Sequence, residues 1–128
     1  MANAHPLKVK LQIFCGNEIA MGPGKADLLD AIEAAGSISA AARNMGMSYR
    51  RAWMLVDTLN RCWAEPVVET VAGGSHEKGA RVSEFGKRLL GSYRALHDTI
   101  DASASIGFES ELAIHLREIP RPSHHKPA

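Results

Sequence analysis

The sequence is poor in cysteine and contains no long apolar run. Its two cysteines, Cys15 and Cys62, lie far apart and do not have the spacing of paired metal ligands. A disulfide between them is an alternative, although a reduced chain is the simpler interpretation. The N-terminal segment lacks the apolar stretch of a secretion signal, and no stretch is long enough to span a membrane. We therefore expect a soluble, cytoplasmic protein.

Patterns that support catalysis are also scarce. The sequence shows no nucleophile beside a base and no carboxylate pair at a recognisable spacing, so we do not expect an enzyme. The segment from Gly22 to Lys25 lacks the glycine frame and the following serine or threonine of a phosphate-binding loop. Six histidines are present, but only the tail pair His124 and His125 is closely spaced. No cofactor is expected, and a metal-responsive sensor remains an alternative.

The charge is nearly balanced over the whole chain but unevenly distributed along it. The 128 residues carry a net charge of +1, with 45% hydrophobic and 23% charged residues, which is typical of one globular domain. Between Ser37 and Arg61, however, four arginines face a single acidic residue, Asp57. A local basic face on a near-neutral protein is typical of a specific DNA reader.

Residues 37–60 predict two helices joined by a tight turn. Two apolar stripes have helical spacing, formed by Ile38, Ala41, Ala42 and Met45 and then by Ala52, Val56 and Leu59. Gly46 allows the first helix to stop, because glycine reaches positive φ without steric cost. Ser48 is a natural N-cap for the second helix.

The exposed start of the second helix carries Tyr49, Arg50 and Arg51. A helix-turn-helix places such residues in the major groove, where arginine forks suit phosphate or guanine. Any small helical hairpin with solvated arginines is the alternative. Ser39 and Arg43 on the first helix, and Arg61 near the end of the second, are further candidate DNA contacts.

The N-terminal part predicts a hairpin and a helix. Apolar and polar residues alternate from Lys8 to Phe14, which favours a half-buried strand. Gly16 and Asn17 signal a turn, and residues 18–21 are expected to return as a second strand. A helix over about 25–35, ended by Gly36, should follow.

The C-terminal part predicts a wing and a long helix. Glu65 and Pro66 should end the recognition helix, and strands near 67–71 and 80–82 should flank a glycine-containing loop with Lys78 as a candidate phosphate contact. From Ser83 and Glu84 onward, one apolar face extends over about four turns. Its outer part is a candidate dimer surface. Residues 108–119 suggest a short further helix, and the proline-rich end is expected to be disordered.

These segments resemble the N-terminal DNA-binding domain of the molybdate-dependent, ModE-type regulator family. The resemblance rests on GSISAAARNMGMSYRRAW from Gly36, VDTLNR from Val56, VETVAGG from Val68 and GARVSEFGKRLLGSY from Gly79, and it covers roughly residues 8–100. It implies a winged helix-turn-helix related to LysR-type domains, and a homodimer built through the terminal helix and the N-terminal strands. It also implies that two recognition helices read an inverted repeat. Trp53 matches the family's tryptophan, with packing at a buried edge and DNA contact as alternatives.

The sequence departs from the family in two ways. Full-length members continue into molybdate-binding domains, whereas this sequence stops near where those would begin, so molybdate sensing is not carried over. In the wing, Ser75 stands where the family has a lysine directly after Gly-Gly; Lys78 is a candidate replacement, and Glu77 would oppose a phosphate contact.

We therefore predict an α+β, mainly helical fold: a winged helix-turn-helix with an N-terminal hairpin and a long C-terminal dimerisation helix. The expected parts are a flexible start (1–7), the DNA-binding domain (8–103), an extension (104–119) and a disordered tail (120–128). The expected function is sequence-specific regulation of transcription by a dimer, connected with molybdenum homeostasis. Its partners are double-stranded DNA and an oxyanion or a separate sensor protein; a protein-interaction module is the rival. The candidate contacts are Ser39, Arg43, Ser48, Tyr49, Arg50, Arg51, Arg61 and Lys78.

Overall fold

The computed structural model describes residues 6–71 and 79–124. These residues divide between two units, Lys10–His97 and a second unit that takes in the chain on either side of it. The predicted wing residue Lys78 lies outside the described residues, as do most of the predicted flexible start and part of the predicted tail. The predicted division of the chain at residue 103 stays a prediction.

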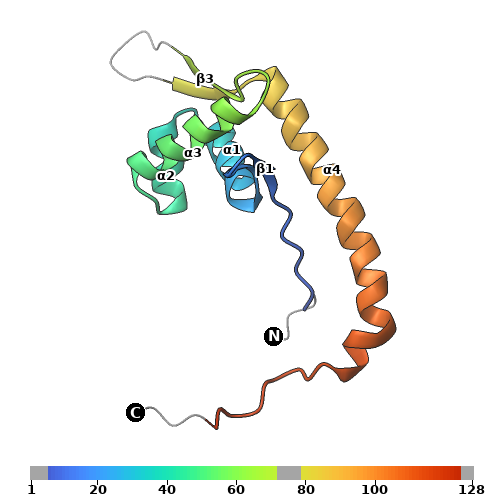
Figure 1. Cartoon of the computed structure of the whole chain (residues 1–128). Helices are drawn as coiled ribbons and strands as arrows, with labels where there is room; N and C mark the ends of the chain where they lie inside the picture. The colour runs from blue at the N-terminus through green and yellow to red at the C-terminus, as the bar shows by residue number, and fades with distance from the viewer. Residues whose placement is uncertain (1–5, 72–78, 125–128) are drawn as a thin grey trace. The chain divides into compact units, whose positions relative to one another are not determined.

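The unit Lys10–His97 consists of a bundle of three helices and two separate β-hairpins, and it contains the start of a long fourth helix (Figure 1). In chain order the elements of the described chain are β1 (Ile13–Cys15), β2 (Glu18–Met21), α1 (Pro23–Ala35), α2 (Ile38–Met45), α3 (Tyr49–Cys62), β3 (Val68–Val71), β4 (Gly79–Val82) and α4 (Glu84–Gly107). A π-helical turn (Phe108–Leu112) and a 3-10 turn (Ala113–His115) follow α4. The predicted α+β winged helix-turn-helix is confirmed.

The core lies where the three helices meet. The apolar stripes predicted for α2 and α3 are buried there, together with one face of α1 and residues of both hairpins; its largest fully buried side chains are Met21, Leu28, Leu29, Ile32, Leu59, Val67 and Val82. Each fully buried side chain of this size stabilises the fold by roughly 1.5–3 kcal/mol relative to its exposed state. This core fixes α3 against α2, with its opposite face in solvent.

The first hairpin is shorter than the alternating pattern predicted. The expected strand over residues 8–14 is found only at Ile13–Cys15, paired with β2 across a turn in which Gly16 has φ of 58°. The alternation upstream reflects packing rather than pairing, because Leu11 contacts the core and its carbonyl accepts a hydrogen bond of 2.7 Å from the Tyr93 hydroxyl. The predicted second strand, residues 18–21, is confirmed.

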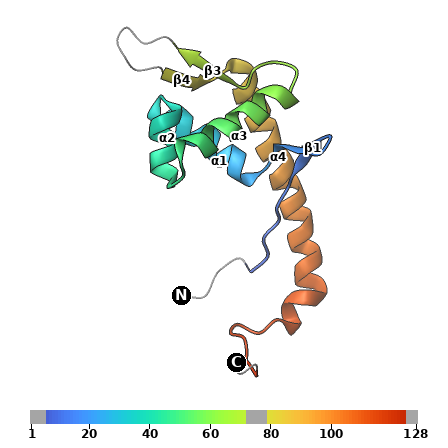
Figure 2. The ribbon, with the colours of Figure 1, turned by 60° about the vertical axis from the view of Figure 1, so that its left-hand side comes forward.

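The second hairpin forms the base of the predicted wing. Strands β3 and β4 pair antiparallel from Val68 opposite Val82 to Val71 opposite Gly79, and Figures 1 and 2 show this hairpin beside α3. Ser83 then begins α4, because its hydroxyl accepts the Gly86 amide at 2.9 Å and donates to the Pro66 carbonyl at 2.6 Å. The wing and the start of α4 are therefore locked together.

The ends of α3 and α4 lie a few residues beyond their apolar patterns. The recognition helix ends at Cys62, before Glu65 and Pro66, where Trp63 leaves the helix and its indole Nε1 donates to the Ala20 carbonyl at 2.9 Å. The fourth helix continues to Gly107, beyond the point where its apolar pattern weakens.

The predicted further helix over 108–119 was wrong in extent. Only the two short turns between Phe108 and His115 form, and Ile119 lies outside them. The side chains of Leu112, Ile114, Leu116 and Ile119 are all exposed. No helix of the described chain has the length and apolar character needed to cross a membrane.

Candidate nucleic-acid interface

Helices α2 and α3 form the helix-turn-helix, and each begins with a serine cap. The Ser37 hydroxyl accepts the Ala40 amide and the Ser48 hydroxyl accepts the Arg51 amide, both at 3.1 Å. Gly46, with φ of 69°, ends α2 as predicted. The turn is therefore formed by the residues predicted for it, and the Ser48 hydroxyl acts as the N-cap acceptor of α3.

The first turn of α3 is presented to solvent. Ser48, Tyr49, Arg50 and Arg51 are all exposed, and the Tyr49 side chain keeps 52% of its accessible surface. Within the described part of the chain, no ion pair is recorded for Arg50, Arg51 or Arg43. By contrast, Arg81 pairs with Glu69 across the wing, at 3.1 Å. The positive charge at the first turn is thus not neutralised by a neighbouring carboxylate.

A groove of about 820 Å³ runs between α3, the N-terminal end of α2 and the wing. Hydroxyl-bearing and apolar side chains both line it, among them Ser37, Thr70 and Val71. Its α2 side carries Ser39 and Arg43, joined by a hydrogen bond of 3.3 Å from Arg43 Nη1 to Ser39 Oγ. Its wing side carries Thr70. The groove therefore brings together three of the predicted contacts, Ser39, Arg43 and Tyr49, whereas Ser48, Arg50 and Arg51 line a separate hollow.

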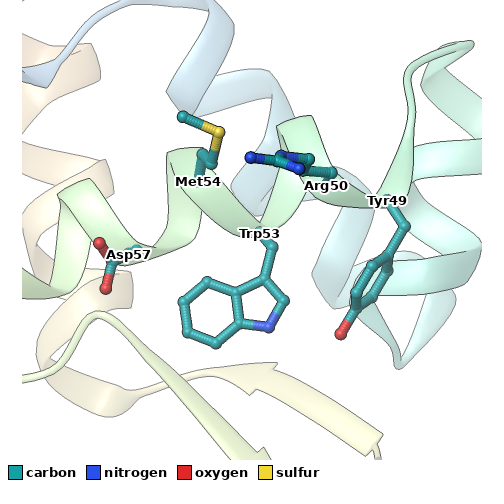
Figure 3. Close-up of a pocket in the computed structure, with 5 residues that line it drawn as sticks. All are labelled: Tyr49, Arg50, Trp53, Met54 and Asp57. Carbon is teal, nitrogen blue, oxygen red and sulfur yellow. The ribbon is translucent and has the colours of Figure 1, made fainter.

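Two aromatic side chains of α3 lie on the groove side. Figure 3 shows Tyr49 and Trp53 on one side of the helix and Arg50 with Met54 on the other. Residues four apart share a helix face, which explains the pairing of the two rings. Trp53 keeps 46% of its surface accessible, so the buried-edge interpretation was wrong and contact with a ligand stays open.

Met54 is a surface residue that the sequence analysis missed. Its side chain is 61% exposed, and it lines shallow hollows on either side of Arg50. In the sequence, its position two residues after the buried Ala52 already indicates that Met54 lies on the solvent face of α3.

Arg61 is held by carboxylates at the far end of α3. Its guanidinium contacts Glu18 at 2.6 Å and Asp57 at 2.8 Å, and these two carboxylates raise the pKa of Arg61. The same hydrogen bond from Arg61 lowers the pKa of Glu18. A DNA contact by Arg61 stays a prediction. Because Glu18 and Asp57 already neutralise the charge of Arg61, its attraction for phosphate should be weaker than that of Arg51.

Asn60 fastens the wing to the recognition helix, and no signal in the sequence identified it. Its Oδ1 accepts the amides of Val67 at 2.8 Å and Val68 at 3.0 Å, and its Nδ2 donates to the Val68 carbonyl at 3.0 Å. One side chain therefore sets where the wing leaves α3. The hydrogen bonds of Asn60 depend on the path that the chain takes after Pro66. The spacing of residues in the sequence does not predict that path.

Metal binding finds no support in the described residues. No group of three or more histidine, cysteine, aspartate or glutamate side chains lies close enough to hold a metal ion in the part of the chain that the structure describes.

The fold and this surface define a winged helix-turn-helix protein with a basic recognition helix. Comparison with known proteins confirms the predicted resemblance to the ModE type. The chain is 45% identical over 69 residues to the molybdenum transport protein ModE of Azotobacter vinelandii, covering 54% of this chain and 26% of that protein. It is 39% identical over 101 residues to the molybdenum-pterin-binding protein MopB of Rhodobacter capsulatus, covering 79% and 37%. It is 32% identical over 93 residues to the transcriptional regulator ModE of Haemophilus influenzae, covering 73% and 35%.

The chain thus spans about a quarter to two fifths of the length of these relatives. No family model matches it. Among solved structures, it is similar to the LysR-type regulator LysG of Corynebacterium glutamicum, with a TM-score of 0.48 and 24% identity over 78% of this chain and 31% of that one. It is also similar to ArgP of Mycobacterium tuberculosis, with a TM-score of 0.45 and 22% identity over 70% and 31%.

Proposed function

We propose that this protein is a sequence-specific DNA-binding regulator of transcription that acts in the cytoplasm. The observation that carries the proposal is the capped, solvent-exposed first turn of α3, whose arginines have no carboxylate partner among the described residues. The positive end of the helix dipole adds to that charge. The relatives named as transcriptional regulators support the same reading.

The first turn of α3 enters the major groove, where base edges are distinguishable. Arg50 reads a base, with Tyr49 and Ser48 beside it, since Arg50 projects away from the groove that the wing shares. A bidentate arginine–guanine pair contributes roughly 1–3 kcal/mol of discrimination. Arg51 contacts phosphate.

The groove between α3 and the wing takes the sugar-phosphate backbone of one strand. Arg43 supplies charge and Ser39 a hydroxyl on the α2 side, where their mutual hydrogen bond orients the guanidinium. The ring of Trp53 packs against a sugar. Lys78 remains a proposed phosphate contact of the wing.

The active species is a homodimer that reads an inverted repeat. Its half-sites then lie about 34 Å apart, one turn of DNA, or a multiple of that distance. Exposed apolar side chains toward the C-terminal end, including Ile106 at 74% and Ile114 at 72%, support a surface that is covered in the dimer. DNA binding by the helix-turn-helix and the wing needs no oxyanion in this proposal.

The test is a selection of bound duplexes from random DNA, run with and without molybdate. We expect an inverted repeat in both arms. Enrichment only with molybdate would instead identify an oxyanion-responsive regulator, and no enrichment would favour a protein-interaction module.

The matched variants are Arg50→Ala and Arg88→Ala. Both remove an exposed arginine from a helix, but Arg88 lies on α4. Arg50→Ala should lose preference at one position of each half-site, by about 10-fold or more. Arg88→Ala should select the parent sequence. Equal selection by both variants would overturn the assignment of Arg50.

A further inference from the structure

The two cysteines of the chain meet where the first hairpin contacts the end of the recognition helix. Cys15 is the last residue of β1 and Cys62 the last residue of α3, and Cys15 is among the groups that raise the pKa of the Cys62 thiol. They lie 47 positions apart in sequence, so only the tertiary fold brings them together. Both are free thiols.

Contacts on both sides of Cys62 hold this junction in place. The preceding Arg61 binds Glu18 at 2.6 Å, and Glu18 is the cross-strand neighbour of Cys15. The following Trp63 donates from Nε1 to the Ala20 carbonyl at 2.9 Å. These two contacts attach the first hairpin to the end of α3 on either side of Cys62, and so bring the positions of the two cysteines together.

The two thiols differ in access. Cys15 is exposed, whereas Cys62 is half-buried. Burial, with the neighbouring Cys15 as the next cause, raises the pKa of the Cys62 thiol. An oxidant in solution therefore reaches Cys15 first, while Cys62 stays a protonated thiol beside it.

We propose that Cys15 and Cys62 form a redox modification site that closes to an intramolecular disulfide when the protein meets a peroxide. The Cys15 thiolate attacks the peroxide, the O–O bond breaks, and Cys15 becomes a sulfenic acid; the leaving hydroxide takes up the proton that the Cys15 thiol had released and becomes one water. The Cys62 sulfur then attacks the Cys15 sulfur, the S–O bond breaks, and the leaving hydroxide takes up the Cys62 proton as a second water. Two thiols lose two electrons in total, and one hydrogen peroxide gains them.

The disulfide stabilises the fold and does not control DNA binding. It joins the hairpin to the last residue of α3, while Arg51 lies 11 residues earlier, about 16 Å along the helix axis. Closing a loop of this length removes conformational freedom from the unfolded chain. Oxidation should therefore raise the thermal midpoint by several degrees, reversibly with dithiothreitol, and leave the DNA selection unchanged.

The experiment treats the reduced full chain with about one equivalent of hydrogen peroxide and then alkylates the remaining thiols. We expect the loss of two hydrogen atoms by mass, no alkylation, a linked peptide pair containing Cys15 and Cys62, and full reversal by dithiothreitol. The single variants Cys15→Ser and Cys62→Ser are the controls. Cys62→Ser should give a Cys15 sulfenic acid that a dimedone probe captures, and Cys15→Ser should resist oxidation.

Three results would overturn the proposal. These are a disulfide between two copies of the chain, over-oxidation of Cys15 while Cys62 remains alkylatable, or oxidation of Cys15→Ser as fast as that of the parent. None depends on DNA binding, so the site can fail while the proposed function stands.

Discussion

At the residue scale, the ion pair of Arg61 with Glu18 makes stability depend on pH. Arg61 lowers the pKa of Glu18 from 4.5, chiefly through a hydrogen bond to the carboxylate. A lowered folded-state pKa contributes stability that is present above the unfolded pKa and is lost as the pH falls through the folded value. The stability of the parent protein should therefore decline as the solution is acidified below about 4.5.

The variant Glu18→Gln should be slightly less stable than the parent at pH 7, and the difference should vanish at low pH. Urea unfolding at a series of pH values measures it. Glu65→Gln is the matched control, because Glu65 is exposed and no ion pair is recorded for it among the described residues. A difference that persists unchanged down to pH 2 would contradict the role given to this pair.

At the element scale, the start of α4 is packed so closely against the wing that it requires glycine. A Cβ atom at Gly86 would lie 2.4 Å from the Val67 carbonyl oxygen and 2.8 Å from Cγ1 of Val82. Gly86→Ala should therefore destabilise the protein by about 1–3 kcal/mol. Gly91, five residues further along the same helix, has no atom within 4 Å of such a Cβ. Gly91→Ala should stabilise by up to about 1 kcal/mol, since alanine favours helix.

Thermal and urea unfolding of the two alanine variants measure this contrast. Shifts of the same sign and size would mean that helix propensity, and not contact with the wing, decides the choice of glycine at Gly86.

The side-chain amide of Asn60 joins the wing to α3 through three hydrogen bonds. Asn60→Ala leaves the amides of Val67 and Val68 without their acceptor, and Val67 is fully buried. We expect a loss of about 2–4 kcal/mol. Asn60→Asp keeps the acceptor for both amides but loses the donor to the Val68 carbonyl. Its free energy of unfolding should therefore lie between those of the parent and of Asn60→Ala. Asn44→Ala, at an exposed position on α2, should cost little.

DNA affinity separates a positioning role of Asn60 from a purely structural one. Well below the unfolding midpoint, where every variant is folded, Asn60→Ala should still bind the selected operator several-fold more weakly, because the wing no longer leaves α3 at one fixed place. Parent-like affinity under those conditions would restrict Asn60 to stability.

The elements show which features local sequence encodes. Gly46 and Ser48 act through neighbours three or four residues away, as Ser83 does when it caps α4, so these roles could be read directly from spacing. Asn60 and Arg61 act through partners on other elements. Arg61 looked like a free cation in sequence, although Glu18, 43 residues earlier, lies against it. The alternating segment before Ile13 was wrongly predicted to be a strand for the same reason. Its partner is distant in sequence, because the Tyr93 hydroxyl donates a hydrogen bond to the Leu11 carbonyl.

At the scale of the whole molecule, the exposed apolar side chains beyond His97 predict self-association. Leu112→Glu, which places a charge at a 63% exposed apolar position, should shift the protein toward monomer in sedimentation equilibrium. Its affinity for an inverted repeat should fall, while its affinity for a half-site should not change. Ser103→Glu adds the same charge at an exposed polar position of α4 and serves as the control. A parent-like mass for both variants would place the dimer surface elsewhere.

The near-zero net charge of the molecule makes its salt dependence a measure of local contacts. A chain of net charge +1 has little long-range attraction for DNA, so the slope of log affinity against log salt reports the phosphates that individual cations neutralise. With Arg43, Arg51 and the proposed contact Lys78 acting in each half of a dimer, six contacts give a slope of about −5.4. Arg51→Ala should weaken binding to all sequences and reduce the slope by about 1.8, because two contacts are lost. Arg50→Ala should relax base preference with a smaller change in slope. If Arg51→Ala kept the parent slope while losing base preference, the roles of the two arginines would be exchanged.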